Sequence, residues 1–140
     1  MFNLSLSSVM ERKRFVTASP EKSVSQAAGL MASKNVGAIL VVEGGKLVGI
    51  FTERDVVFRV VAMGLDPKMT PLGAVMTAEP ITLSPSQLYG HALVVMQENG
   101  FRHLPVVEDG VAIGIISSRN AMDPDLEEFV SDQRRHEHFR

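Results

Sequence analysis

The sequence contains an internal repeat. When the chain is shifted by 65 residues, residues 16–55 align with residues 81–120 without a gap, and twelve of these forty positions are identical. Repeat architectures of the solenoid type need at least three stacked units, and here the period occurs only twice. We therefore predict two related halves that cover each other's apolar faces about a pseudo-twofold axis.

The composition is that of one small soluble domain. Of its 140 residues, 45% are hydrophobic and 21% charged, and the net charge of −2 provides no general attraction to nucleic acid or to an anionic membrane. The absence of cysteine excludes disulfides, thiolate metal sites and cysteine nucleophiles, and suits a reducing compartment. The basic cluster at 12–14 follows the first apolar residues, the reverse of a signal peptide, and the longest apolar run, 36–42, is too short to cross a bilayer. We expect a cytoplasmic protein without membrane association.

Each repeat is predicted to contain a short strand, a helix, two strands joined by a tight turn, and a second helix. Repeat 1 spans 8–64, a linker 65–73, repeat 2 74–122, and a helical tail 123–140. In repeat 1 the elements are an extended piece at 16–17, a helix between the caps Ser23 and Asn35, strands at 38–42 and 47–51 around Gly44-Gly45, and a helix at 55–63 ended by Gly64. In repeat 2 they are an extended piece at 81–82, a helix at 88–98, and strands at 104–107 and 112–116 around Asp109-Gly110.

One motif closes the second strand of both repeats. In repeat 1, Thr52, Arg54 and Asp55 follow the apolar strand end, and Ser117, Arg119 and Asn120 follow it in repeat 2. A strand that ends at a hydroxyl and continues as a helix leaves unpaired N–H groups at the helix start, which favour an anion. The spacing Thr52-x-x-Asp55 also fits a capping box, so both interpretations stay open. An Asp55 carboxylate turned onto its own backbone, with no hollow beside it, would argue against ligand binding.

These motifs, in this order and present twice, resemble the cystathionine-β-synthase (CBS) domain family in its tandem-pair form. The resemblance covers roughly residues 8–123. It implies an α+β fold in which two βαββα repeats pack sheet to sheet about a pseudo-twofold axis, with a cleft on either side. The matching motifs are Val9-Met10, Val16-Thr17, 36–42 and 49–55 in repeat 1, and Val75-Met76, Ile81-Thr82, 100–107 and 114–120 in repeat 2.

The resemblance implies a regulatory module. Family members often hold adenosine-bearing ligands in these clefts and regulate another protein. We therefore expect AMP, ADP, ATP, NAD or S-adenosylmethionine as a regulatory ligand, a homodimer, and an unknown regulated partner. We expect no enzymatic activity, no required cofactor and no metal, because we find no nucleophile–base pair, phosphate-binding loop or metal-ligand cluster.

The resemblance also assigns roles to residues. Asp55 would accept hydrogen bonds from the ribose hydroxyls, Thr52 would face phosphate at the helix start, and Arg54 would neutralise phosphate charge. In repeat 2, Asn120 replaces the acid and makes only neutral hydrogen bonds, which predicts two unequal sites. The expected ligand-contacting residues are Thr17, Val36, Gly37, Ala38, Thr52, Arg54, Asp55, Thr82, Phe101, Arg102, His103, Ser117, Arg119 and Asn120.

Several of these residues have a plain structural alternative. The adenine is expected in an apolar slot near 36–38 or 101–103, but Val36 and Phe101 also fit core packing. His103 fits either a pH-sensitive phosphate ligand or a partly buried polar residue at a strand start. Two rival functions stay open. One is an interaction scaffold with empty clefts, whose feature would be the tail stripe Leu126, Phe129 and Val130. The other is a nucleic-acid binder that uses the basic residues, which the acidic net charge disfavours.

Overall fold

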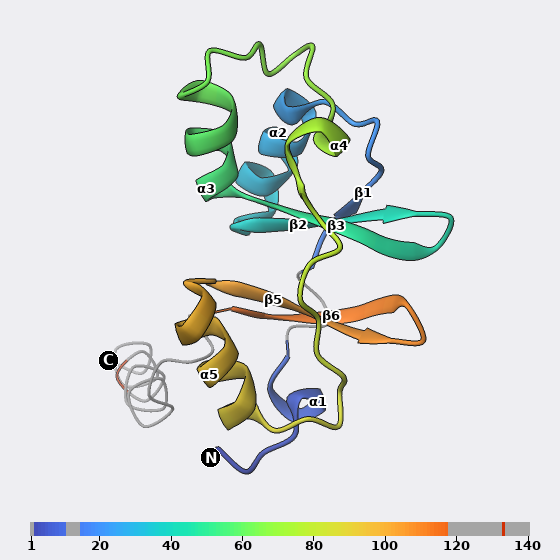
Figure 1. The fold of residues 1–140 in the computed structure, drawn as a ribbon, viewed down its shortest axis with the longest axis vertical. Coiled ribbons are helices and arrows are strands. Elements are labelled where there is room, and N and C mark those ends of the chain that lie inside the picture. The colour runs from blue at the N-terminus through green and yellow to red at the C-terminus, as the bar shows by residue number, and fades with distance from the viewer. Residues whose placement is uncertain (1, 11–14, 118–132, 134–140) are drawn as a thin grey trace.

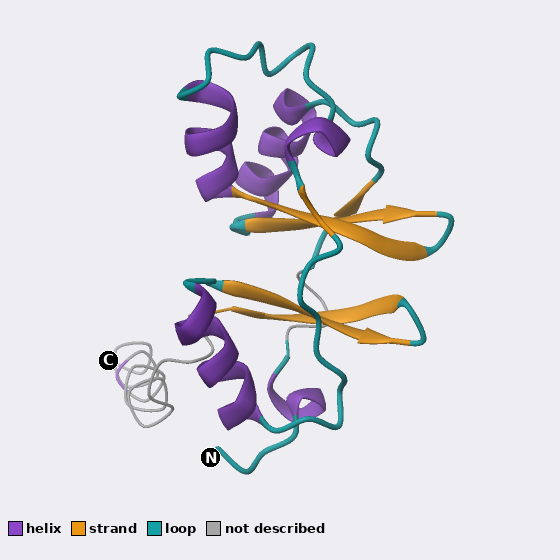
Figure 2. Cartoon of the chain, in the orientation of Figure 1, coloured by secondary structure: helices purple, strands orange, loops and turns teal. Residues whose placement is uncertain are grey.

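Two β-sheets face each other, and the helices lie on the outer sides of both (Figures 1 and 2). This computed structural model describes residues 2–10, 15–117 and 133. The first sheet has the strand order β1-β2-β3-β4 and the second contains β5 and β6. The predicted α+β class and the sheet-to-sheet packing of the two halves are confirmed.

The elements alternate along the chain much as the repeat predicts. The first half contains α1 (Leu6–Val9), β1 (Thr17–Ala18), α2 (Val24–Lys34), β2 (Ala38–Glu43), β3 (Lys46–Thr52), α3 (Glu53–Asp55) and η1 (Val56–Val61). The second half contains α4 (Leu72–Val75), β4 (Thr77–Ala78), α5 (Tyr89–Asn99), β5 (His103–Glu108) and β6 (Val111–Ser117). At 81–82, where we expected a strand, the structure has only an isolated parallel bridge one residue later, between Leu83 and Val106. The predicted tail helix lies outside the described residues, apart from residue 133.

The two hairpins are built alike and touch each other at their tips. Gly44-Gly45 and Asp109-Gly110 all have positive φ, as two-residue hairpin turns require. Across the halves, the Lys46 ammonium donates to the Asp109 carbonyl at 2.7 Å. The Leu47 amide likewise donates to the Gly110 carbonyl at 3.0 Å. These contacts join the sheets at the hairpin end, opposite the edge where β3 runs into α3 (Figure 1).

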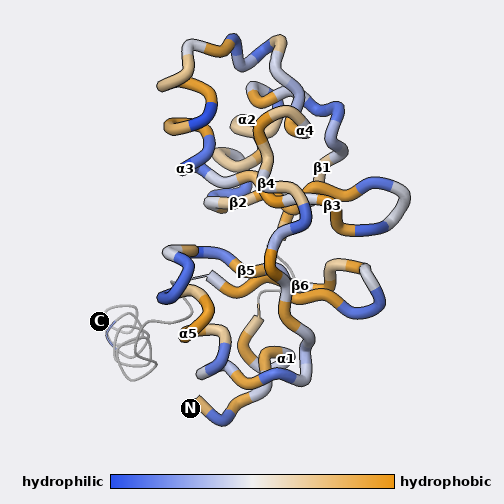
Figure 3. The backbone as a smooth tube through the Cα atoms, viewed as in Figure 1, coloured by the Kyte–Doolittle hydropathy of each residue, from blue (hydrophilic) through white to orange (hydrophobic). Residues whose placement is uncertain are grey.

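Three apolar clusters form the hydrophobic core of the protein. One lies under α2 and one under α5, and the third, which includes Leu40, Ile50 and Ile115, lies between the two sheets. The chain coloured by hydropathy shows hydrophobic residues along the facing strands (Figure 3). Burial of these side chains is the dominant favourable contribution to the association of the two halves.

The short helices pack across the repeat boundaries. Leu6 of α1 is fully buried in the cluster under α5, although it precedes repeat 1 in the sequence. Conversely, Leu72 of α4, which precedes repeat 2, is fully buried in the cluster under α2. Each half is therefore completed by a segment that the chain places just before the other half.

Segments from across the repeat boundary also cap the long helices: the first amides of α2, those of Val24 and Ser25, donate to the linker carbonyls of Thr70 and Pro67, both at 2.9 Å. α2 begins with a capping box formed by Ser23 and Gln26, as the N-cap prediction requires. α5 has no side-chain cap, and its first amides, those of Tyr89 and Gly90, instead donate to the carbonyls of Leu4 and Phe2 at 2.8 and 3.1 Å. Backbone carbonyls of the N-terminal segment thus satisfy donors that a helix start otherwise leaves unpaired.

The helix predicted at 55–63 differs from expectation in its start and its winding. It begins at Glu53 and changes to a π-helix over Val56–Val61. The Ala62 amide bonds to the Val57 carbonyl, and the Leu65 amide to the Val60 carbonyl, at 2.8 and 3.0 Å. Four of the six π-helical residues are valines, whose branched side chains crowd an α-helical turn. No helix within the described part of the chain is long and apolar enough to cross a membrane.

Candidate functional site

The candidate site lies where β2 begins and β3 ends. Ala38 and Thr52 are register partners at this edge, and the Gly37 carbonyl accepts a hydrogen bond from the Glu53 amide at 3.0 Å. The start of one strand and the start of the following helix are therefore held side by side. In the second sheet, His103 and Ser117 are partners in the same register.

Thr52 and Asp55 form a capping box. The Thr52 amide donates to Asp55 Oδ2 at 2.9 Å, and the Asp55 amide donates to Thr52 Oγ1 at 3.3 Å. The capping interpretation of this motif is thus confirmed. The Glu53 amide is also paired, so the backbone amides of Thr52, Glu53 and Asp55 all have acceptors within this chain. The open anion site expected here is largely occupied by the protein's own groups.

Only one oxygen of the Asp55 carboxylate faces the backbone. The other, Oδ1, lies 3.4 Å from Nε of Arg59, and the two side chains are 13% and 48% exposed. Arg59 also donates to the carbonyls of Val75 and Met76 at 3.2 and 3.1 Å, at the end of α4. Sequence reasoning missed Arg59, although its i,i+4 spacing from Asp55 is a recognisable signal.

Side chains from the two halves converge at Gly37. A Cβ atom placed on Gly37 would lie 3.2 Å from Glu53 Oε1 and 3.2 Å from both Cε1 and Nε2 of His103. Glu53 comes from the first half and His103 from the second. The absence of a side chain at position 37 therefore leaves room for a polar junction that both halves share. Glu53 was not among the predicted site residues, and nothing local in the sequence indicates this contact.

The structure does not bring all the predicted residues to this junction. Val36 packs against the core under α2, which confirms its structural alternative, whereas Phe101 is 37% exposed. The guanidinium of Arg54 lies 4.6 Å from the centre of the Phe58 ring. Thr17, Thr82 and Arg102 are exposed. Arg119 and Asn120 lie outside the described residues, so the comparison of two unequal sites stays a prediction.

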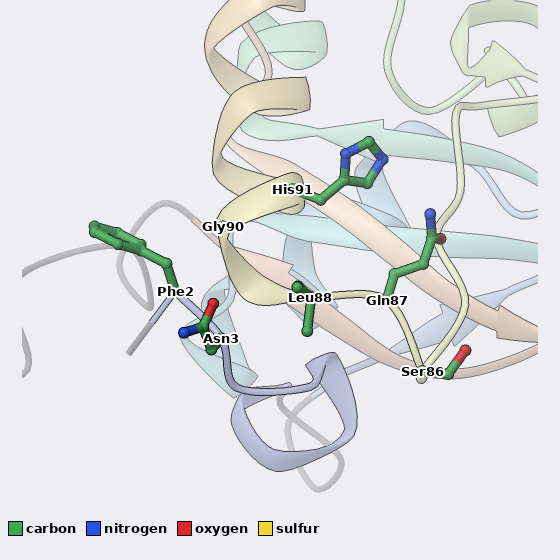
Figure 4. Close-up of a pocket in the computed structure, with 7 residues that line it drawn as sticks. All are labelled: Phe2, Asn3, Ser86, Gln87, Leu88, Gly90 and His91. Atoms are coloured by element: carbon green, nitrogen blue, oxygen red, sulfur yellow. The ribbon is translucent and has the colours of Figure 1, made fainter.

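A cavity of about 440 Å³ lies elsewhere, at the outer end of the second half (Figure 4). It lies between the N-terminal segment and the start of α5, and it is open to solvent. Sequence reasoning did not find it, and none of the predicted site residues contributes to it. Its lining consists of Phe2, Asn3, Ser86, Gln87, Leu88, Gly90 and His91.

Comparison with known proteins identifies relatives of the whole module. The CBS domain family model matches residues 6–62 and 72–124. CBS domain-containing protein YhcV of Bacillus subtilis is 39% identical over 101 residues, which cover 72% of this chain and 71% of that protein. The mitochondrial CBSX3 of Arabidopsis thaliana is 39% identical over 92 residues, 62% of this chain and 45% of that protein. The chain thus spans less than half the length of this plant relative.

Solved structures share the fold over most of the chain. An uncharacterized conserved protein from Pyrococcus horikoshii is 27% identical with a TM-score of 0.82, covering 89% of this chain and 94% of that chain. The CBS-domain containing protein ATU1752 from Agrobacterium tumefaciens is 31% identical with a TM-score of 0.75, covering 84% and 95%. Two family matches in tandem, with the observed pair of facing sheets, lead to one conclusion: this chain belongs to the CBS domain family.

Proposed function

We propose that this protein is a regulatory module that binds an adenosine-bearing ligand between its two repeats and signals its presence to a partner protein. The observation that carries the proposal is the junction at Gly37, where Glu53 of one half and His103 of the other approach the same point. A ligand bound there would contact both halves. Its binding would therefore favour one arrangement of the halves over another, which a partner can recognise.

The ligand class is supported by a structural relative. The CBS domain pair of protein MJ0100 was solved in complex with 5′-methylthioadenosine and S-adenosyl-L-methionine. That pair is 23% identical to this chain with a TM-score of 0.76. The likeness is one of fold alone, so it supports an adenosyl ligand without selecting among AMP, ADP, ATP, NAD and S-adenosylmethionine.

Asp55 acts, in this proposal, first as a cap and then as a ribose acceptor. Its Oδ1 lies outside the capping box and is paired with the half-exposed Arg59, so a ribose hydroxyl could replace Arg59 as the partner of this oxygen. Two hydroxyls bound to one carboxylate make charge-assisted hydrogen bonds, which are stronger than neutral ones. The gain offsets the loss of the ion pair with Arg59, which contributes about 0.3–0.5 kcal/mol.

The proposed module works as a cytoplasmic homodimer without enzymatic activity. The outward face of η1 supports a second copy as its partner, because Val57, Phe58 and Val61 are 54%, 56% and 66% exposed. Contiguous exposed apolar side chains on a helix commonly mark a protein interface. Light scattering after size exclusion tests this: Phe58→Ser should shift a wild-type dimer toward monomer, and a monomeric wild type would contradict it.

Thermal denaturation with a ligand panel tests the function. Adenosine, AMP, ATP, NAD and S-adenosylmethionine would each be added at millimolar concentration, with guanosine as a control nucleoside. A ligand present at 100 times its Kd stabilises the folded state by about 2.7 kcal/mol, which is a clear rise in Tm. If no adenosyl compound raises Tm, the interaction scaffold with empty clefts becomes the better interpretation.

A further inference from the structure

We propose that Glu53 is a charge filter at the Gly37 junction, which makes this site favour adenosyl ligands with few or no phosphates over di- and triphosphates. This inference rests on the proposed function, since it names the ligand class of the same site. It assigns a specificity role to a residue that neither the motif nor the fold identifies.

The position of the Glu53 carboxylate carries the argument. Its Oε1 and His103 Nε2 each lie 3.2 Å from the point that a Gly37 Cβ would occupy, so the two atoms are within twice that distance of each other. The backbone of Glu53 is fixed here by its amide, which donates to the Gly37 carbonyl at 3.0 Å. The carboxylate therefore lies close to the imidazole of the opposite half, on the residue that follows Thr52, which the resemblance would place against phosphate.

The carboxylate of Glu53 forms no ion pair within the described part of the chain. Among the described residues, no basic group lies within 4.0 Å of its carboxylate. The nearby guanidinium groups have other contacts: Arg59 pairs with Asp55, and Arg54 lies over Phe58. The amides of Thr52 and Asp55, which could offset a phosphate charge, already donate within the capping box.

A phosphate group at this junction would therefore meet a like charge. Two unit charges about 6 Å apart in a partly solvated site repel enough to change affinity by roughly three- to tenfold, and salt reduces the effect. The penalty grows with the number of phosphate charges close to the carboxylate. A neutral nucleoside pays no such penalty, because it carries no charge for Glu53 to repel.

Isothermal titration calorimetry on Glu53→Gln tests the filter with adenosine, AMP and ATP as probes. Gln keeps the size of the side chain and removes its charge. We expect adenosine affinity to stay within about twofold, while AMP and ATP gain roughly three- to tenfold, with the larger gain for ATP. Glu53→Asp, which keeps the charge, should retain most of the discrimination.

Glu43→Gln is the matched control. Glu43 is an exposed acid at the far end of β2, so its removal changes the net charge equally without altering the junction. Equal gains for phosphate ligands in both variants, or unchanged ratios of ATP to adenosine affinity in Glu53→Gln, would overturn the filter while leaving the sensor function intact. No binding of any of the three probes by wild type or variant would overturn the proposed function and the filter together.

Discussion

Substitutions of Asp55 can separate its role in capping the helix from its proposed role in binding the ligand. Asp55→Ala removes the acceptor of the Thr52 amide at 2.9 Å and the partner of Arg59 at 3.4 Å. Thr52 remains as the N-cap, so the variant loses one hydrogen bond of the capping box, about 0.5–1.5 kcal/mol, and a half-exposed i,i+4 ion pair, only about 0.3–0.5 kcal/mol. The sum, about 1–2 kcal/mol, should lower Tm by roughly 3–8 °C for a domain of this size.

Asp55→Asn is the informative variant. Its amide oxygen can still accept from Thr52, so most of the cap should survive and Tm should fall by only about 1–3 °C. The charge-assisted bonds to a ribose would become neutral, which weakens them by about 1 kcal/mol. Calorimetry with adenosine should therefore show a roughly fivefold loss of affinity that the small change in stability does not explain.

The control for this series is Asp66→Asn. Asp66 accepts a hydrogen bond from the Lys68 amide at 3.0 Å in the linker, so it loses the same charge in a local turn outside the junction. Its adenosine affinity should match wild type. If Asp55→Asn also binds adenosine as tightly as wild type, Asp55 is a helix cap and nothing more, and the ribose assignment is refuted.

Three further predictions concern glycines and the N-terminal segment. Gly49→Ala should destabilise the protein by about 1–3 kcal/mol in urea denaturation, because its Cβ would overlap the Met76 side chain. Gly29→Ala in α2 meets no atom and should stabilise the protein by about 0.5–1 kcal/mol. The reverse order of stability would contradict the packing described. Gly37→Ala should cost at most about 1 kcal/mol, since flexible side chains can yield, but should weaken adenosine binding in calorimetry; unchanged affinity would place the ligand elsewhere. Deletion of residues 1–5 removes the carbonyl caps of α5, so hydrogen exchange should accelerate at the start of α5 and leave α2 unchanged.

Sequence reasoning succeeded where a structure depends on neighbouring residues. The Ser23 cap, the end of α2 at Asn35 and the two hairpin turns all occur as predicted. In each case the side chains and φ angles involved lie within a few residues, so a local pattern specifies them. The winding of η1 was missed because π-helical turns are rare and valine-rich segments also occur in ordinary α-helices.

The site was predicted less completely, and for a different reason. The Thr52-x-x-Asp55 spacing was found, but it is the same for a capping box and for a ligand site. Glu53 carries no motif of its own, and Gly37 and His103 are separated by more than sixty residues. Their approach depends on how the two sheets face each other, which no short sequence pattern encodes.

The sequence by itself determined the duplication, the alternation of strands and helices, and the family, because these follow from residue identities at fixed spacings. Only the tertiary structure decided that α1 completes the second half and α4 the first, and that an acid and a histidine meet over Gly37. The physical reason is that an apolar face can be buried by any segment that reaches it. Which segment does so is settled by the packing of the whole chain.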